Sequence, residues 1–221
     1  MIFSIFFIFP VLIFSCGDVC NEDDGAYTPN SYHNVPPSPE CASGYSKFLR
    51  PGYVWCMKIY SVLDVTQTQA QTQCAADGAV LSGFQNRVEN QWIAANGIAL
   101  AVNTYTISIG ALWVGLRIRD ECDFADYATS DACTPVINSS YYWTDGYTTN
   151  YNQINWIQGS PGSYLKRCAS MITYVRTLNP GYTVNPLNMQ TIRCDLTDET
   201  ADYPYEKIIG FVCGKLPEFY D

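Results

Sequence analysis

Ten cysteines are the residues of this chain whose chemistry can be judged from type and spacing alone. They do not form the paired C-x-x-C knuckles of structural zinc sites, so zinc is a poor explanation for them. Thiols in such number are unusual in the cytosol, where they stay reduced, but normal in oxidising compartments, where they form disulfides. We therefore expect a disulfide-stapled protein that is secreted and extracellular.

The chain contains one histidine, His33, which excludes most histidine-dependent catalytic systems. Ser-His-Asp and Cys-His nucleophiles, like histidine-based zinc sites, need a histidine beside their other groups. His33 instead lies in a segment that we interpret below as a tether. Two carboxylates at a suitable separation would be enough for a glycosidase, but no motif locates such a pair. We therefore expect a binding protein and no enzyme.

The N-terminal segment is typical of a signal peptide. Residues 2–14 are almost wholly apolar, yet this run is shorter than the about 20 residues that a bilayer span requires. Ser15 and Gly17 are small residues three and one positions before a possible signal-peptide cleavage site, which predicts a signal peptide over residues 1–17. Cleavage there removes Cys16 and leaves nine cysteines. No later segment is long and apolar enough, so we expect no membrane span.

Residues 18–40 predict an acidic, Pro-rich tether. They hold Pro29, Pro36, Pro37 and Pro39 and five acidic residues, with no Lys or Arg, and they show no apolar period. The whole chain has a net charge of −9. No basic stripe exists to neutralise phosphates, so we expect no nucleic acid and no anionic membrane surface as partners.

Two helices are predicted in the first half of the chain. Thr66, Ala70 and Cys74 fall on one helical face, and Gly78 follows as a stop signal. A second helix follows Gly83; its period places Val88, Trp92 and Ala95 on one face and ends it at Gly97.

The second half predicts strands and one long loop. Leu112, Val114, Leu116 and Ile118 alternate as in a buried strand. Residues 141–143, 168–174 and 208–213 are the other predicted strands. The stretch from 144 to 167 is rich in Asn, Gly, Tyr and Pro, and a loop of that length is usually functional or disordered. Helices followed by strands predict an α+β fold.

These pieces occur in a recognisable order over residues 41–213, and together they resemble a C-type lectin-like domain. The pieces that carry the resemblance are the cysteines and the following motifs: Gly78-Ala79-Val80-Leu81, Glu89 with Trp92, Trp113-Val114-Gly115-Leu116, Trp143-Thr144-Asp145-Gly146, Asn155-Trp156 and Phe211-Val212-Cys213. The pair Cys122 and Cys133 and the acidic leader further resemble secreted nematode members of the family. Residues 214–221 would then form a C-terminal tail.

The resemblance implies a fold and a set of disulfides. The fold is two helices packed on antiparallel sheets with a long ligand-binding loop. The family's pattern pairs Cys41 with Cys56, Cys74 with Cys213, and Cys168 with Cys194. Proximity along the chain predicts that Cys122 pairs with Cys133. Cys20 is left over; it either pairs with Cys16, if cleavage falls earlier, or links two chains as a disulfide-bonded dimer.

The resemblance also raises the question of calcium. Sugar-binding members hold Ca²⁺ with Glu-Pro-Asn or Gln-Pro-Asp in the long loop and a later Asn-Asp pair, because Ca²⁺ takes 6–8 oxygen ligands. The matching positions here are Ser160-Pro161-Gly162 and Gln190-Thr191, which carry no carboxylate. We therefore expect no Ca²⁺ and no other cofactor at this site. The family's proline, matched by Pro161, is cis.

Other acidic residues crowd the segments 120–131 and 195–202. Neither shows the spacing of an EF-hand loop, so we interpret both as solvated loops rather than as a displaced metal site. Asn138-Ser139-Ser140 predicts an N-linked glycan at Asn138.

The ligand is expected on the long loop, where aromatic rings can stack on a sugar or anchor a protein. We interpret Trp143 and Trp156 as core residues. The candidate ligand-binding residues are Tyr147, Tyr151, Asn152, Asn155, Gln158, Ser160, Pro161 and Gln190. The leading hypothesis is carbohydrate recognition in innate defence without calcium. The alternative is a protein-binding or extracellular-matrix module that has lost sugar binding.

Overall fold

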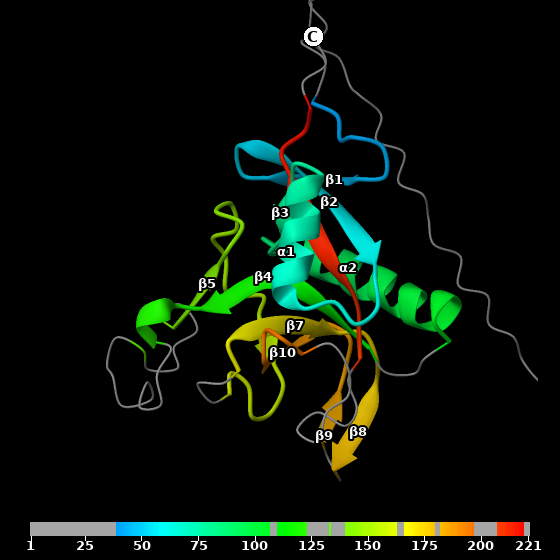
Figure 1. Ribbon diagram of the computed structural model, residues 1–221, viewed down its shortest axis with the longest axis vertical. Helices are drawn as coiled ribbons and strands as arrows, with labels where there is room; N and C mark the ends of the chain where they lie inside the picture. The colour runs from blue at the N-terminus through cyan, green and yellow to red at the C-terminus, as the bar shows by residue number, and fades with distance from the viewer. Residues whose placement is uncertain are drawn as a thin grey trace, which may run out of the picture. The chain divides into compact units, whose positions relative to one another are not determined.

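The computed structural model describes residues 39–106, 110–122, 133, 140–162, 166–179, 182–196 and 207–218. The predicted signal peptide, nearly all of the predicted tether, Cys20 and the predicted glycosylation site Asn138 lie outside these residues. Figure 1 shows the arrangement of the helices and strands.

Helix α1, Gln67–Ala76, confirms the first predicted helix. It begins at a capping box, in which the Thr66 side chain accepts from the Gln69 amide and the Gln69 side chain accepts from the Thr66 amide. Ala70 and Cys74 are buried on one face, as the spacing predicts. The helix ends at Ala76 and is capped by Asp77, just before Gly78 at φ 62°.

Helix α2, Arg87–Ala99, exists where predicted, but its predicted face and end are wrong. Val88 is 66% exposed and Ala95 is exposed, whereas Ile93, Ala94 and Gly97 are buried. The buried side also carries Glu89, a charged residue that periodicity alone assigns to the surface. The helix continues through Gly97 to Ala99 and then into a short π-helix, Leu100–Thr104.

The strands form a nine-stranded sheet and a separate hairpin. The sheet order is β1-β2-β11-β4-β7-β10-β6, with β3 paired to β11 and β5 paired to β4. The strands of this sheet are β1 Ser46–Arg50, β2 Tyr53–Ser61, β3 Val80–Leu81, β4 Ala111–Ile118, β5 Tyr141–Trp143, β6 Asn155–Trp156, β7 Cys168–Ile172, β10 Asn188–Ile192 and β11 Ile208–Lys215. The hairpin joins β8, Arg176–Asn179, to β9, Tyr182–Val184.

Two of the strand pairs are parallel, although only antiparallel pairing is predicted. They are β4 with β11 and β6 with β10. Parallel neighbours need a long crossover, and β5 to β10 lie between β4 and β11 in the chain. The four predicted strands are confirmed, although β7 ends at Ile172 rather than at residue 174. β11 continues to Lys215, two residues beyond the predicted end of the domain.

The two helices pack on opposite faces of the central strands. Along β4, Leu112 and Val114 join the apolar cluster that contains Ile93 of α2, while Trp113 joins the cluster that contains Ala70 of α1. Every residue of β4 except Arg117 is buried. This is why β4 is one of the clearest strand signals in the sequence.

Gly115 of β4 is required by a close backbone approach. A Cβ at this position would lie 2.0 Å from the Leu81 carbonyl oxygen of β3. The Gly115 amide donates to the Ser82 carbonyl at 2.9 Å, which ties β4 to the chain that follows β3. The glycine of the Trp-Val-Gly-Leu motif therefore has a steric cause.

Four disulfides join the pairs expected from the sequence. They are Cys41–Cys56, Cys74–Cys213, Cys122–Cys133 and Cys168–Cys194. Cys74–Cys213 fastens α1 to β11, and Cys168–Cys194 links β7 to the end of β10. Among the helices that the structure describes, none has the length and apolar character needed to cross a membrane.

Candidate ligand-binding site

Asp145 fixes the beginning of the long loop directly after β5. Its Oδ1 accepts from the amides of Tyr147 and Thr148 at 2.9 and 2.8 Å. Its Oδ2 accepts from the Gly83 amide at 2.8 Å and the Thr148 hydroxyl at 2.6 Å. Asp145 is buried, and Gly146 has φ 71°, so this turn is tightly held and presents Tyr147 on its outer side.

A buried ion pair lies beneath the same turn. The Arg50 guanidinium donates to both Glu89 carboxylate oxygens at 2.9 and 2.8 Å, and neither side chain is exposed. Arg50 also donates to the Thr148 hydroxyl at 3.2 Å and lies 4.7 Å from the centre of the Trp55 ring. The pair thus connects β1, α2 and the loop that carries Tyr147.

The middle of the loop packs on the core through aromatic rings. Tyr151 lies 6.0 Å from Trp143, whose indole donates to the Asn150 carbonyl at 3.0 Å. Trp143 is buried as expected, and Trp156 is partly buried against Tyr141. The candidate residues Asn152, Asn155 and Gln158 have exposed side chains.

The positions that match the family's calcium site are joined by their own hydrogen bonds. The Thr191 amide donates to the Ser160 hydroxyl at 3.1 Å, and the Gly162 amide donates to the Thr191 hydroxyl at 2.7 Å. The Gln190 amide group is buried and donates to the Ser170 hydroxyl at 3.1 Å. The Ser160–Pro161 peptide bond is cis.

These residues do not fit a Ca²⁺ ion. The five matching positions offer two hydroxyls, one buried carboxamide and no carboxylate, and both hydroxyls already accept hydrogen bonds from backbone amides. Hard cations need several anionic or carbonyl oxygens turned towards one point. Within the described part of the chain, no group of three or more Asp, Glu, His and Cys side chains is placed to hold a metal.

Tyr147 belongs to a different site from the other loop residues. Its ring lies 4.7 Å from Trp55 and 6.1 Å from Tyr53, and its carbonyl accepts from the Tyr53 hydroxyl at 2.9 Å. Ser160 and Gln190 instead contact β10 and β7. In the sheet order, β4 and β7 separate β10 from β11 and β2, so the structure divides the candidate residues between two places.

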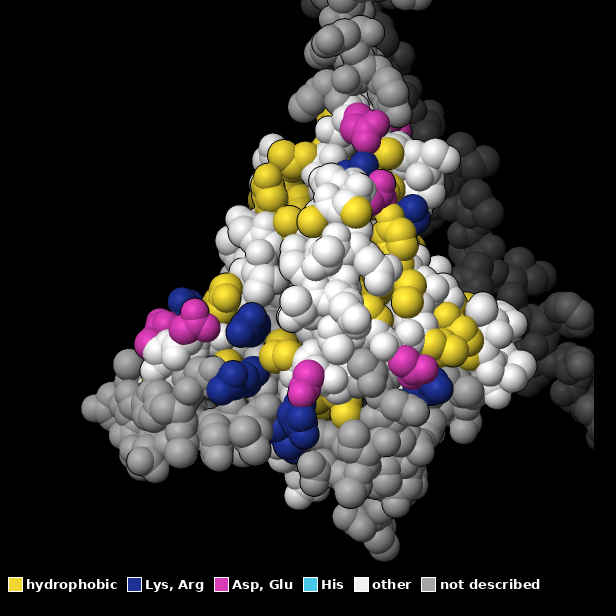
Figure 2. Space-filling view, in the orientation of Figure 1, with side chains coloured by type: hydrophobic (Ala, Val, Ile, Leu, Met, Phe, Trp, Pro, Cys, Tyr) yellow, Lys and Arg dark blue, Asp and Glu magenta, His cyan; other side chains and the backbone are white. Residues whose placement is uncertain are grey.

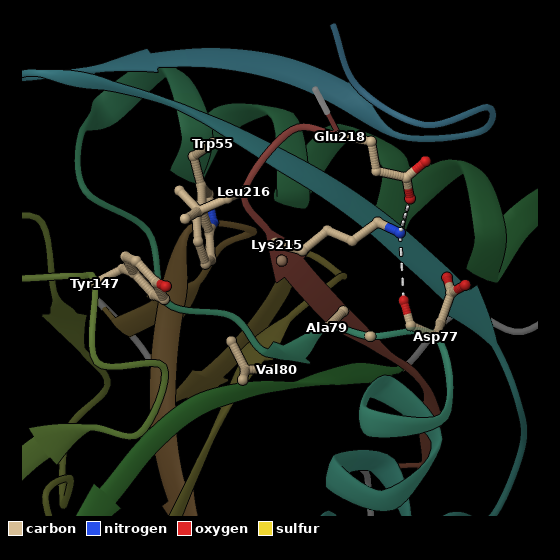
Figure 3. Close-up of a pocket in the computed structure, with 10 residues that line it drawn as sticks. Trp55, Asp77, Ala79, Val80, Tyr147, Lys215, Leu216 and Glu218 are labelled. Atoms are coloured by element: carbon tan, nitrogen blue, oxygen red, sulfur yellow. Dashed lines mark hydrogen bonds and ion pairs between the residues drawn. The ribbon is translucent and has the colours of Figure 1, made fainter. Parts of the chain in front are cut away.

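The first of these places is a pocket of about 440 Å³. Figure 3 shows Trp55 and Tyr147 at one end of it, Asp77 and Glu218 at the other, and Lys215 between them. Its lining is Trp55, Asp77, Gly78, Ala79, Val80, Tyr147, Gly214, Lys215, Leu216 and Glu218. Only Tyr147 of these is among the residues predicted to bind a ligand. The rest come from segments far apart in the sequence, with no shared motif to mark them.

The charged end of the pocket is a hydrogen-bonded cluster. Lys215 Nζ donates to Glu218 Oε1 at 2.9 Å and to the Asp77 carbonyl at 3.3 Å. Asp77 Oδ2 accepts from the hydroxyls of Tyr45, at 2.6 Å, and Tyr60. These hydrogen bonds to the ionised form hold the pKa of Asp77 below its ordinary value. Burial, followed by the bond to Asp77, raises the pKa of Tyr45 well above its ordinary value.

Most of the chain matches the model of a known protein family. This model, described as C-type lectin domain-containing protein 141/158, matches residues 51–216. No curated protein matches the sequence. Similar solved structures include the mouse scavenger receptor C-type lectin carbohydrate-recognition domain (18% identity, 82% of this chain and 100% of that chain, TM-score 0.45).

Two further similar structures are those of human lithostathine and of a calcium-independent type II antifreeze protein. Human lithostathine is 16% identical and covers 85% of this chain and 99% of its own, with a TM-score of 0.48. A calcium-independent type II antifreeze protein is 15% identical and covers 81% of this chain and 97% of its own, with a TM-score of 0.48. The family model spans most of the chain and includes both helices, the long loop and β11. The chain therefore belongs to the C-type lectin domain family.

Proposed function

We propose that the chain is a secreted lectin-like protein that binds carbohydrate in innate defence without using calcium. Family membership supports a lectin-like binding module, and four disulfides suit an oxidising, extracellular compartment. Three further features remain predictions from the sequence: the resemblance to nematode members of the family, an N-linked glycan at Asn138, and a dimer linked through Cys20.

One observation carries the calcium-independent part of this proposal. The hydrogen bonds among Ser160, Gly162 and Thr191 occupy the place where related lectins coordinate Ca²⁺. Recruiting a cation there would require breaking these bonds, and the residues offer no carboxylate in return. A saccharide bound by this chain must then be held by hydrogen bonds and ring stacking alone.

A glycan array probed with the mature protein tests the proposal. We expect the same glycans to be bound in calcium and in chelator. Binding that chelator abolishes would contradict calcium independence. An array that stays silent under both conditions would reject carbohydrate binding and favour the protein-binding alternative.

A further inference from the structure

We propose that the pocket between Tyr147 and Lys215 is a binding site for a neutral hexopyranose. This inference rests on the proposed carbohydrate binding and gives it a location away from the 160–162 segment. The pocket, at about 440 Å³, falls within the range of about 300–1,000 Å³ found for small-molecule sites.

The aromatic end of the pocket can receive the apolar face of a sugar ring. Tyr147 and Leu216 are 39% and 41% exposed, so their side chains are accessible at the rim. Trp55 lies behind Tyr147 and is fully buried, with its indole donating to the Ser82 hydroxyl at 3.0 Å. A fixed ring beneath an accessible one is a rigid platform for stacking on C–H groups.

Gly214 lets the Trp55 indole pack directly on β11. A Cβ at Gly214 would lie 2.5 Å from the Trp55 ring, so any side chain would displace the indole. The bare backbone of β11 thus forms part of the pocket wall between Trp55 and Lys215.

The other end of the pocket can hydrogen-bond sugar hydroxyls. Lys215 Nζ is an ammonium donor, and the Glu218 carboxylate is an acceptor. The Asp77 carboxylate is bonded through Oδ2 to Tyr45, Tyr60 and Lys58, which lie outside the lining, and Asp77 contributes its backbone carbonyl as the acceptor for Lys215. Glu218 is half exposed and uses Oε1 for Lys215.

The charges at this end of the pocket balance, which favours a neutral sugar. Asp77 is paired with Lys58, and Glu218 is paired with Lys215. A sialylated or sulfated sugar would compete with these carboxylates for the ammonium groups, whereas a neutral hydroxyl can donate to Glu218 without breaking either pair. Apolar side chains also gather over the turn between β1 and β2 (Figure 2), whereas the pocket combines apolar walls with a charged donor and acceptor pair, Lys215 and Glu218.

The test is a nitrogen-15 NMR titration of the mature chain in chelator, with lactose and maltose as neutral probes and sialyllactose as the anionic one. We expect at least one neutral probe to shift the signals of Val80, Gly214 and the Trp55 indole, and sialyllactose to bind more weakly. Leu216→Ala and Tyr147→Ala should each weaken binding roughly tenfold. Leu49→Ala, an exposed leucine outside the pocket, is the matched control and should change nothing.

The outcomes separate this inference from the proposed function. Calcium-independent binding that Leu216→Ala and Tyr147→Ala leave unchanged would overturn the pocket and keep the function. Tighter binding of sialyllactose would overturn the choice of a neutral ligand. If no probe and no arrayed glycan binds, both the pocket and the proposed carbohydrate binding are overturned. Circular dichroism of each variant confirms folding, and Leu216→Ala, at the exposed rim, keeps the test valid if Tyr147→Ala unfolds.

Discussion

Arg50 and Glu89 show how much of the site's geometry rests on one pair of side chains. The guanidinium bonds both carboxylate oxygens and also reaches Thr148 in the turn of Tyr147. Glu89 in turn accepts from the Gln85 amide at 2.6 Å. Because both charged groups are buried away from water, removing either one would leave the other as an unpaired buried charge.

We expect Arg50→Met to lower the free energy of unfolding by about 3–5 kcal/mol, since it leaves Glu89 as a buried charge without its partner. Urea denaturation with the disulfides intact measures the change. Arg193→Met is the control; it breaks the exposed pair with Asp195 and should lower the free energy by about 0–1 kcal/mol. Equal losses in the two variants would contradict the role given to Arg50.

Asp77 introduces a pH dependence at the charged end of the pocket. Its pKa in the folded chain lies below the ordinary value of 3.8 because the hydroxyls of Tyr45 and Tyr60 donate to the ionised form. The bonds therefore stabilise the fold fully above that ordinary value, and the stabilisation is lost as pH falls through the lowered pKa.

The Asp77→Asn variant should thus have a lower free energy of unfolding than the natural chain near neutral pH. This difference in free energy should narrow in strong acid, where Asp77 itself is protonated. Urea denaturation at about pH 6 and about pH 2 measures both differences. The effect is expected to be small because the carboxylate is 42% exposed. A difference that stays constant over this range would show that Asp77 does not act through its charge.

Among the helices and strands, the sequence predicts best those whose pattern lies within a single segment of the chain. The Thr66 cap, the small residues that follow it and the alternation in β4 each lie within one segment, and α1 and β4 form as predicted. The buried face of α2 could not be predicted, because Glu89 is buried only by virtue of Arg50, 39 residues earlier. The sequence does not predict β2 and β10, because the sheet buries consecutive residues in both and neither shows an apolar alternation. It does not predict β1 either, because a charged residue, Arg50, takes one of its buried positions.

Gly97 illustrates the same limit within α2. The residue was predicted to end the helix, but the structure places it where a Cβ would lie 2.6 Å from Thr173 Cγ2 and 2.9 Å from Leu112 Cδ1. It permits close packing of α2 on the sheet and lies inside the helix.

Gly97→Ala should therefore destabilise the fold by about 1–3 kcal/mol through overpacking, although alanine favours a helix by about 1 kcal/mol over glycine. Urea denaturation gives the sign directly. Gln91→Ala, exposed on the same helix, should stay within about 0.5 kcal/mol of the natural chain. A stabilised Gly97→Ala would show that the helix can move away from Thr173 freely.

In the molecule as a whole, the disulfides and the order of strands in the sheet bring segments that are far apart in the sequence into one domain. Cys74–Cys213 closes 139 residues and Cys122–Cys133 closes 11; by loop entropy alone the first stabilises by about 5 kcal/mol and the second by about 3. The longer bridge fastens α1 to β11, the strand that ends at Lys215, directly before Leu216. The same topology assembles the pocket.

This assembly explains which part of the candidate site could be predicted. The loss of carboxylates at Ser160, Gly162, Gln190 and Thr191 is visible in the sequence because the family's motif marks those positions. The pocket is not visible, because Trp55, Val80 and Leu216 become neighbours only when β2, β3 and β11 align. Gln190, predicted to face a ligand, is buried because β10 lies between β7 and β6.

We propose that internal hydrogen bonds among Ser160, Gly162 and Thr191 take the place of calcium coordination in this lectin-like domain. An NMR titration of the mature chain with Ca²⁺ tests this proposal most directly, by following the backbone amide signals of Gly162 and Thr191. Both signals are expected to stay in place as calcium is raised to a large excess. A saturable shift of these two signals, accompanied by a higher melting temperature in calcium than in chelator, would contradict it.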